Sequence, residues 1–345
     1  MLSRVASHLY WLSRYLERAE NMARILDVGH SLALLSGQGD ERAATEPLVI
    51  TDTLDAFKAT GAAPTSENVA RFLAWDPGHP SSIANCLEAS RENARAVRGS
   101  ITSEMWENIN DTWLQLFAKR RADREPIDSA FFDWVKERSH LFRGVTFATI
   151  RRDQPYQFIR LGTFLERADN TARILSVKQA RQDAAAGAQA GGGAAGPAGG
   201  PAAGQAGGQA AGQAGGQAGG RAGGDVVTDY YRLSAVLRSV SALEAYRDIY
   251  RDAIDSRRVA ELLIFEPSVP RSLRFCFDEV ERILAELPQE PGRYPRRLAA
   301  HMLALLEHGE LDDVYEVGLD AFLDRFLGNN VRLGAAVNAA YMEIK

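Results

Sequence analysis

Hydrophobic residues recur every three or four positions through the first 36 residues of the chain. Leu2, Val5, Leu9 and Leu12 begin the series, and this spacing places them on one face of an α-helix. Two glycines follow soon after the last hydrophobic position, which is typical of a helix end. The pattern therefore predicts a long helix over residues 2–36.

Helical spacing covers most of the remaining chain as well. The β-branched runs at 48–51 and 145–150 are too short and too isolated to form a sheet. We therefore predict an all-α protein, a bundle of helices. The further predicted helices span residues 46–60, 65–75, 81–119 with a break near residue 99, 126–150, 155–181, 226–253, 256–265, 270–287, 294–308 and 311–344.

Two stretches of the sequence occur twice. Tyr15–Val28, YLERAENMARILDV, recurs as Phe164–Val177, FLERADNTARILSV, with ten identities over 14 positions. Residues 69–86 recur at 259–276 around Asp/Glu-Pro-x-x-Pro, a pattern that ends one helix and begins another. Because a helix and a corner are both repeated, we predict two tandem repeats related by a pseudo-two-fold axis.

The predicted repeats span residues 1–150 and 151–345. Within the second, residues 182–224 are almost entirely Gly, Ala, Gln and Pro. Such a composition has little apolar surface to offset the entropy of ordering. We interpret this segment as a disordered insertion between the first helix of the second repeat and the helices that follow. In the repeated corners, Pro80 and Pro270 are expected in the first turn of the new helix.

Each copy of the longer repeat carries a glutamate, an asparagine and an arginine at positions i, i+4 and i+7, on one side of a helix. If the two helices pack together, each carboxylate is expected to meet an arginine of the other copy and to fix how the halves dock. Alternatively these groups line a cleft, in which arginine and asparagine hold a carboxylate or phosphate and glutamate is a general base. The residues are Glu17, Asn21 and Arg24 in the first copy and Glu166, Asn170 and Arg173 in the second.

A second polar cluster lies in the segment RENARAVRGSITSEMW. Its arginines, at spacings of three and four, share one side of a helix, and they form either a solvated charged face or part of a binding site. The candidate binding residues here are Arg95, Arg98, Glu104 and Trp106.

Few other chemistries find support in the sequence. Glu137 and His140 have the Glu-x-x-His spacing of di-metal bundles, but such a site needs a second motif, so we predict no metal site and no cofactor. Cys86 and Cys276 occupy equivalent corner positions without a histidine at a recurrent spacing, which favours small buried hydrophobes over nucleophiles. No phosphate-binding loop or hydrolase signature is present.

Composition narrows the class of protein. The 345 residues carry a formal net charge of −5, which gives no electrostatic argument for binding nucleic acid or an anionic membrane. The sequence holds neither a signal-peptide apolar region nor a run of about 20 apolar residues. Two cysteines do not indicate a disulfide framework. We therefore expect a cytoplasmic protein.

Three segments carry a resemblance: LSRVASHLYWLSRYLERAENMARILDV, SRENARAVRGSITSEMWENIN and FIRLGTFLERADNTARILSV. Together they resemble the bacterial alpha-E domain family, an all-helical family named for helices that bear a glutamate. Its members typically occur beside, or fused to, a circularly permuted ATP-grasp ligase. The resemblance implies a role in peptide ligation or modification, and it points to the two polar triplets and the second cluster as the residues of interest.

Three functions remain open from the sequence. In the first, the chain is a non-catalytic helical partner that binds an ATP-grasp-type amide ligase or its peptide substrate. In the second, it is an enzyme that acts on a peptide-like amide, with Glu17 and Glu166 as catalytic residues and the other candidates binding the substrate. In the third, it is a structural interaction module. No α/β segment of the ligase type exists in the chain.

Overall fold

The computed structural model describes residues 1–36, 41–121, 127–191 and 230–343. Every regular element in those ranges is a helix, so the prediction of an all-α protein is confirmed. The helices of the N-terminal half are α1 (Ser3–Ser36), α2 (Glu41–Ile50), α3 (Leu54–Ala59), α4 (Ser66–Trp75), α5 (Ile83–Ala96), the 3-10 helix η1 (Arg98–Ser100), α6 (Ser103–Arg121) and α7 (Ser129–Thr149).

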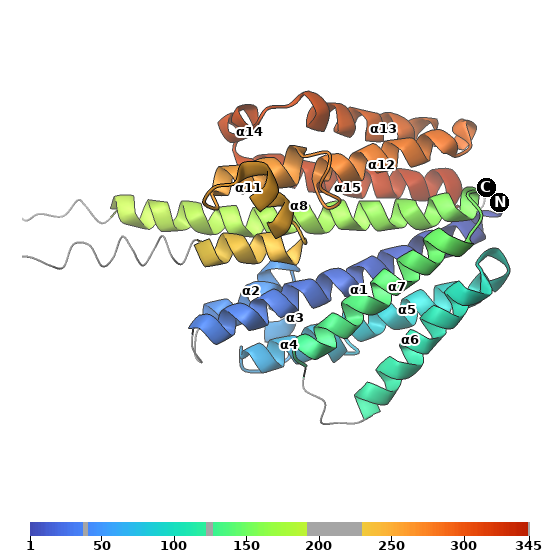
Figure 1. Cartoon of the computed structure of the whole chain (residues 1–345), viewed down its shortest axis with the longest axis horizontal. Coiled ribbons are helices and arrows are strands. Elements are labelled where there is room, and N and C mark those ends of the chain that lie inside the picture. The colour runs from blue at the N-terminus through green and yellow to red at the C-terminus, as the bar shows by residue number, and fades with distance from the viewer. Residues whose placement is uncertain (37–40, 122–126, 192–229, 344–345) are drawn as a thin grey trace, which may run out of the picture.

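The C-terminal half begins with a second long helix and continues through shorter ones. A helix without a label in Figure 1 covers residues 230–239. The other helices of this half are α8 (Gln154–Gly191), α10 (Leu243–Tyr250), α11 (Ser256–Phe265), α12 (Leu273–Glu286), α13 (Gln289–His308), α14 (Leu311–Val317) and α15 (Leu319–Tyr341).

The two long helices α1 and α8 run side by side through the middle of the molecule and in the same direction (Figure 1). On one side of this pair, α1 packs against α5 and α7. On the other side, α8 packs against α12 and α15. The interface between α1 and α8 therefore joins the two halves of the chain.

A glycine allows α1 and α8 to approach closely. A Cβ atom placed on Gly162 of α8 would lie 2.3 Å from the Ser13 hydroxyl oxygen and 2.4 Å from the Tyr10 carbonyl oxygen of α1. Both distances are far below van der Waals contact, so a side chain at this position would force the helices apart. Ser13 turns its hydroxyl back to the Tyr10 carbonyl at 2.9 Å, which keeps its own polar group satisfied at the crossing.

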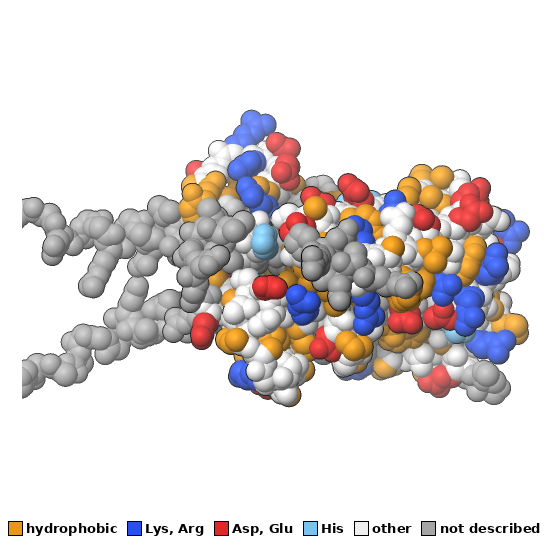
Figure 2. All heavy atoms as spheres, turned by 90° about the horizontal axis from the view of Figure 1, so that it is seen from below, with side chains coloured by type: hydrophobic (Ala, Val, Ile, Leu, Met, Phe, Trp, Pro, Cys, Tyr) orange, Lys and Arg blue, Asp and Glu red, His pale blue; other side chains and the backbone are white. Residues whose placement is uncertain are grey.

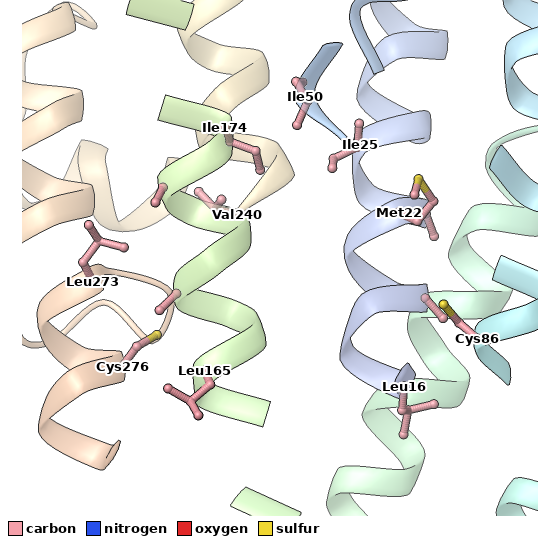
Figure 3. Packing of buried hydrophobic residues seen from close by; sticks show 14 of the residues in the cluster. Leu16, Met22, Ile25, Ile50, Cys86, Leu165, Ile174, Val240, Leu273 and Cys276 are labelled. Carbon is pink, nitrogen blue, oxygen red and sulfur yellow. The ribbon is translucent and has the colours of Figure 1, made fainter. Parts of the chain in front are cut away.

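The hydrophobic core extends from this crossing into both halves. Figure 3 shows Leu16 of α1 and Cys86 of α5 on one side, and Leu165 of α8 and Cys276 of α12 on the other. Both cysteines are fully buried and free, and burial raises the pKa of each thiol to about 12. At neutral pH they are protonated and inaccessible, in the buried positions that the sequence predicted.

The two repeated corners end and restart helices through serine caps. Ser82 accepts a hydrogen bond from the backbone N–H of Asn85, and Ser272 accepts one from Phe275, at the first turns of α5 and α12. Pro80 and Pro270 lie ahead of these caps, so the expectation that they occupy the first turn is wrong. A serine side chain satisfies a free N–H of the helix terminus, which proline cannot do.

Three predicted helices are each divided in two. The breaks fall at Asp52, Ser241 and Gly318, whose φ angles are 55°, 54° and 96°. A residue with positive φ cannot continue a right-handed helix. The hydrophobic spacing continues across each break, which explains why the sequence pattern alone predicted one helix in each case.

Helix α8 extends to Gly191 and so includes the start of the predicted Gly/Ala/Gln-rich insertion. The remainder of that insertion lies outside the described residues. The division into repeats at residues 1–150 and 151–345 stays a prediction from the sequence.

None of the helices in the described ranges has the length and apolar character required to cross a membrane. On the face shown in Figure 2, acidic and basic side chains alternate with apolar ones, and neither sign of charge forms a continuous patch.

Replacing Gly162 by alanine should destabilise the fold by about 1–3 kcal/mol, because the added methyl group overlaps α1 where the helices cross. Chemical denaturation monitored by circular dichroism measures this change. Gly144→Ala is the matched control, since a Cβ there meets no atom within 4 Å. It should be neutral or stabilise by up to about 1 kcal/mol. Equal effects for both substitutions would contradict the close approach at Gly162.

Candidate functional site

Glu17 lies on α1 with 1 % of its surface exposed, and three arginines surround its carboxylate. Arg167 of α8 donates from Nε to Oε1 at 2.9 Å and from Nη2 to Oε2 at 3.3 Å. Arg143 of α7 donates from Nη1 to Oε2 at 2.8 Å. Nη1 of Arg271, in the segment that leads into α12, lies 3.1 Å from Oε1. Each oxygen of Glu17 therefore has two guanidinium partners.

Glu20, one turn further along α1, is fully buried and belongs to the same cluster. Its Oε1 accepts hydrogen bonds from Arg271 at 2.6 Å and from Arg24 at 2.9 Å. Nη2 of Arg143 lies 2.5 Å from Oε2. Arg271 and Arg143 thus bridge the two carboxylates of α1, and Arg24 closes the cluster from the same helix.

Glu166 of α8 has a simpler set of partners. Arg18 of α1 donates from Nε to Oε1 at 2.6 Å and from Nη2 to Oε2 at 3.0 Å. Arg14 donates from Nε to Oε2 at 2.7 Å and bonds the Tyr10 hydroxyl with Nη1. Glu166 is 5 % exposed, so this carboxylate is also closed over by arginines from the opposite helix.

The expectation that each glutamate meets an arginine of the other copy is therefore met, but by different arginines from those expected. The partners are Arg167 for Glu17 and Arg18 for Glu166, each directly following the other glutamate in the sequence. Arg24 and Arg173 instead bond acidic residues one turn earlier on their own helices, Glu20 and Asp169. The reason is the direction of the side chains: Arg14, Arg18 and Arg167 point across the interface between α1 and α8. Helical residues are turned by about 100° from one to the next, so Arg24 and Arg173 lie on a different flank.

The two asparagines of the predicted triplets are buried at equivalent places. Asn21 accepts a hydrogen bond from Arg271 through Oδ1 at 2.8 Å. The Nδ2 atoms of Asn21 and Asn170 are buried without a hydrogen-bond partner. A buried amide donor without a partner costs stability.

The arginines set the protonation state of the buried acids. Burial alone would raise the pKa of Glu17, but the neighbouring guanidinium groups outweigh burial and lower it. The same balance holds the pKa of Glu20 well below its ordinary value and lowers the pKa of Glu166 to about 2. All three carboxylates are therefore ionised at neutral pH, and a strongly lowered pKa makes each a poor acceptor of a substrate proton.

Burial acts in the opposite sense on the most enclosed cation. Arg271 is 5 % exposed, and burial lowers the pKa of its guanidinium to about 10 despite the attraction of Glu17 and Glu20. It remains charged at neutral pH, and its position depends on both carboxylates of α1.

The second predicted cluster is assembled at a separate place. The Arg98 guanidinium lies 4.7 Å from the centre of the Trp106 ring in a cation–π contact. Arg95 forms an exposed ion pair with Glu92, and Glu104 is exposed in the first turn of α6. In the described part of the chain, none of these side chains contacts Glu17 or Glu166. The structure therefore does not join the two clusters into one site.

Two further sequence features are also placed by the structure. His140 of the Glu-x-x-His spacing lies 3.4 Å from Glu20 Oε1 and 3.1 Å from Arg24 Nη2. Among the described residues, no group of three or more His, Cys, Asp or Glu side chains is arranged to hold a metal ion.

Sequence reasoning missed the arginines that complete both networks. Arg18 and Arg167 are identical in the two copies, and this repetition was the available signal. Arg143 and Arg271 lie far from Glu17 in the sequence and outside the longer repeat, so only the tertiary structure identifies them.

Comparison with known proteins assigns the chain to a family. Residues 1–342 match the model of the Alpha-E family, described as a predicted alpha-helical domain with a conserved ER motif. The chain belongs to the alpha-E family. Glu17–Arg18 and Glu166–Arg167 are Glu-Arg dipeptides, and in this alpha-E protein the glutamate of each binds the arginine of the other.

This alpha-E chain is also similar to uncharacterised proteins of Mycobacterium bovis and Mycobacterium tuberculosis. Each is 24 % identical to it over 351 residues, which cover 92 % of this chain and 34 % of the relative. The chain thus spans about a third of the length of the curated relatives it matches. No solved structure matches it significantly.

A double-mutant cycle tests the crossed pairing of the alpha-E dipeptides. Glu166→Gln and Arg18→Gln should show a coupling free energy of about 1–3 kcal/mol, because the two side chains bond directly. The comparison cycle pairs Glu166→Gln with Arg173→Gln, whose guanidinium bonds Asp169 and attracts Glu166 without bonding it. Its coupling should be clearly smaller than the coupling to Arg18. Urea denaturation of the single and double variants measures both, and a larger coupling to Arg173 would refute the assignment.

Acid should remove the contribution of Glu166. Its pKa falls from an ordinary 4.5 to about 2 on folding, so the stabilisation is complete above pH 4.5 and is lost as the pH falls towards 2. The free energy of unfolding of Glu166→Gln should therefore lie below that of the unmodified chain at pH 7, and the gap should narrow between pH 4.5 and 2. Denaturation curves across this range measure the gap. A gap that is independent of pH would show that Glu166 is not held ionised by its arginines.

Proposed function

We propose that this chain is a non-catalytic helical partner of a circularly permuted ATP-grasp-type ligase in a peptide-modification system. In this role it binds the ligase or its peptide substrate, while the ligase forms the amide bond. The observation that carries the proposal is that both candidate catalytic glutamates are already occupied by arginines of the same chain.

The protonation state and burial of the two glutamates favour a role in stabilising the fold over a role in catalysis. A general base needs a pKa near the working pH and a free oxygen within reach of the substrate proton. Glu17 and Glu166 have lowered pKa values and are 1 % and 5 % exposed. Two shallow hollows lie elsewhere, one beside Pro47 and one beside Phe326, and neither glutamate lines them.

The length of the relatives supports a partnership with other domains. In those mycobacterial proteins, about two thirds of each chain lies outside the part that matches this one. An alpha-E region therefore shares a polypeptide with further sequence there. The proposed identity of the partner rests on the resemblance to the alpha-E family, whose members typically occur beside, or fused to, a circularly permuted ATP-grasp ligase.

Co-purification tests the partnership. The chain should co-elute with a circularly permuted ATP-grasp-type ligase and should increase amide formation by that ligase when peptide and ATP are supplied. Size-exclusion chromatography measures the first effect, and mass spectrometry of the peptide product measures the second. An absence of both effects would contradict the proposal.

The Glu166→Gln variant distinguishes a partner from an enzyme. If its thermal melt shows that it is folded at the assay temperature, it should still co-elute and still increase product formation, because Glu166 supports the fold and takes no part in chemistry. Turnover of a peptide amide by the chain alone, lost in a folded Glu166→Gln variant, would instead identify an enzyme.

A further inference from the structure

The cluster around Glu17 and Glu20 contains more positively charged side chains than negatively charged ones. Four arginines meet two carboxylates there, which leaves a net charge of +2. All four carboxylate oxygens already have guanidinium partners, so the surplus is not neutralised inside the cluster. The members are Glu17, Glu20, Arg24, Arg143, Arg167 and Arg271.

The corresponding cluster around Glu166 has a smaller surplus. Arg14 and Arg18 bond Glu166, and Arg173 bonds Asp169. Three arginines therefore meet two carboxylates, which leaves a net charge of +1. The exposed carboxylate of Asp52 adds an electrostatic attraction for Arg173, although burial opposes it: together with Asp169 it raises the pKa of that guanidinium.

Ser241 stands at the position that corresponds to Asp52, beside the cluster around Glu166. The two residues end helices with the same turn. In the first turn, the N–H groups of residues 51, 52 and 53 donate to the carbonyl oxygens of residues 47, 49 and 48. In the second, the N–H groups of residues 240, 241 and 242 donate to the carbonyl oxygens of residues 236, 238 and 237. Their φ angles are 55° and 54°. The larger surplus, with a neutral serine in place of an aspartate beside it, is therefore specific to the cluster around Glu17 and Glu20.

The surplus is accessible from one edge of the cluster. Arg24 Nη1 donates to Ser241 Oγ at 2.6 Å, and its Nη2 lies 3.1 Å from His140 Nε2. Ser241 is exposed, the His140 side chain is 54 % exposed and that of Arg143 is 29 % exposed. We call these four residues, Arg24, His140, Arg143 and Ser241, the arginine edge.

We propose that the arginine edge binds a doubly charged oxyanion of the phosphate class. Two guanidinium groups and a hydroxyl are donors suited to phosphate oxygens, beside an imidazole whose Nε2 accepts from Arg24. A phosphate group carries close to the −2 charge that would neutralise the cluster. A single carboxylate would leave half of the surplus. The inference does not depend on which ligase the chain accompanies.

Phosphate binding to the full-length chain tests the proposal. Isothermal titration with inorganic phosphate, at constant ionic strength set with chloride, should show saturable binding. Ser241→Asp lowers the net charge of the cluster from +2 to +1 and should weaken that binding at least about tenfold, because a new carboxylate competes for the same donors. It should also raise the melting temperature in phosphate-free buffer.

Ser241→Asn is the matched control, since asparagine has the shape of aspartate and tolerates positive φ equally well but adds no charge. It should bind phosphate as the unmodified chain does. Equal binding by the aspartate variant, or no saturable binding by the unmodified chain, would overturn the proposal. Acetate that binds as tightly as phosphate, with the same dependence on Ser241, would overturn the phosphate class in favour of a carboxylate.

Discussion

Two crossed ion pairs between α1 and α8 organise this protein. Glu17 binds Arg167 and Arg18 binds Glu166, so each long helix gives a carboxylate to the other and receives a guanidinium in return. The exchange lies beside the point where Gly162 lets the helices touch. Hydrophobic contacts allow many relative positions of two helices, whereas buried charges allow only those in which every charge is paired.

The crossed pairs also connect the outer helices to the central ones. Arg143 extends from α7, and Arg271 extends from the corner before α12, to the same two carboxylates of α1. Together with Arg167 of α8, three other parts of the chain therefore meet α1 at Glu17 and Glu20. Desolvating so many charges costs several kcal/mol, and we infer that the benefit is a single defined arrangement of the two halves.

The same network of ion pairs limits what the glutamates of the two Glu-Arg dipeptides can do chemically. A glutamate that is ionised and surrounded by arginines holds the fold together, and it is not free to move a proton. What remains available to a ligand is the positive charge in excess, at the exposed edge formed by Arg24, His140, Arg143 and Ser241. In this arrangement the buried acids support the fold, and only the outer cations face solvent.

The sequence by itself determined the helices, the repeated polar positions and the burial of the two cysteines, because all three follow from local spacing. It also indicated that glutamates and arginines of the two copies would pair. Only the tertiary structure decided that Arg18 and Arg167 are the partners, since that choice depends on which flank of each helix faces the other. Arg143 and Arg271 could not be predicted for a similar reason: they reach Glu17 from α7 and from the corner before α12, both far away in the sequence, and no local pattern records a contact that packing creates.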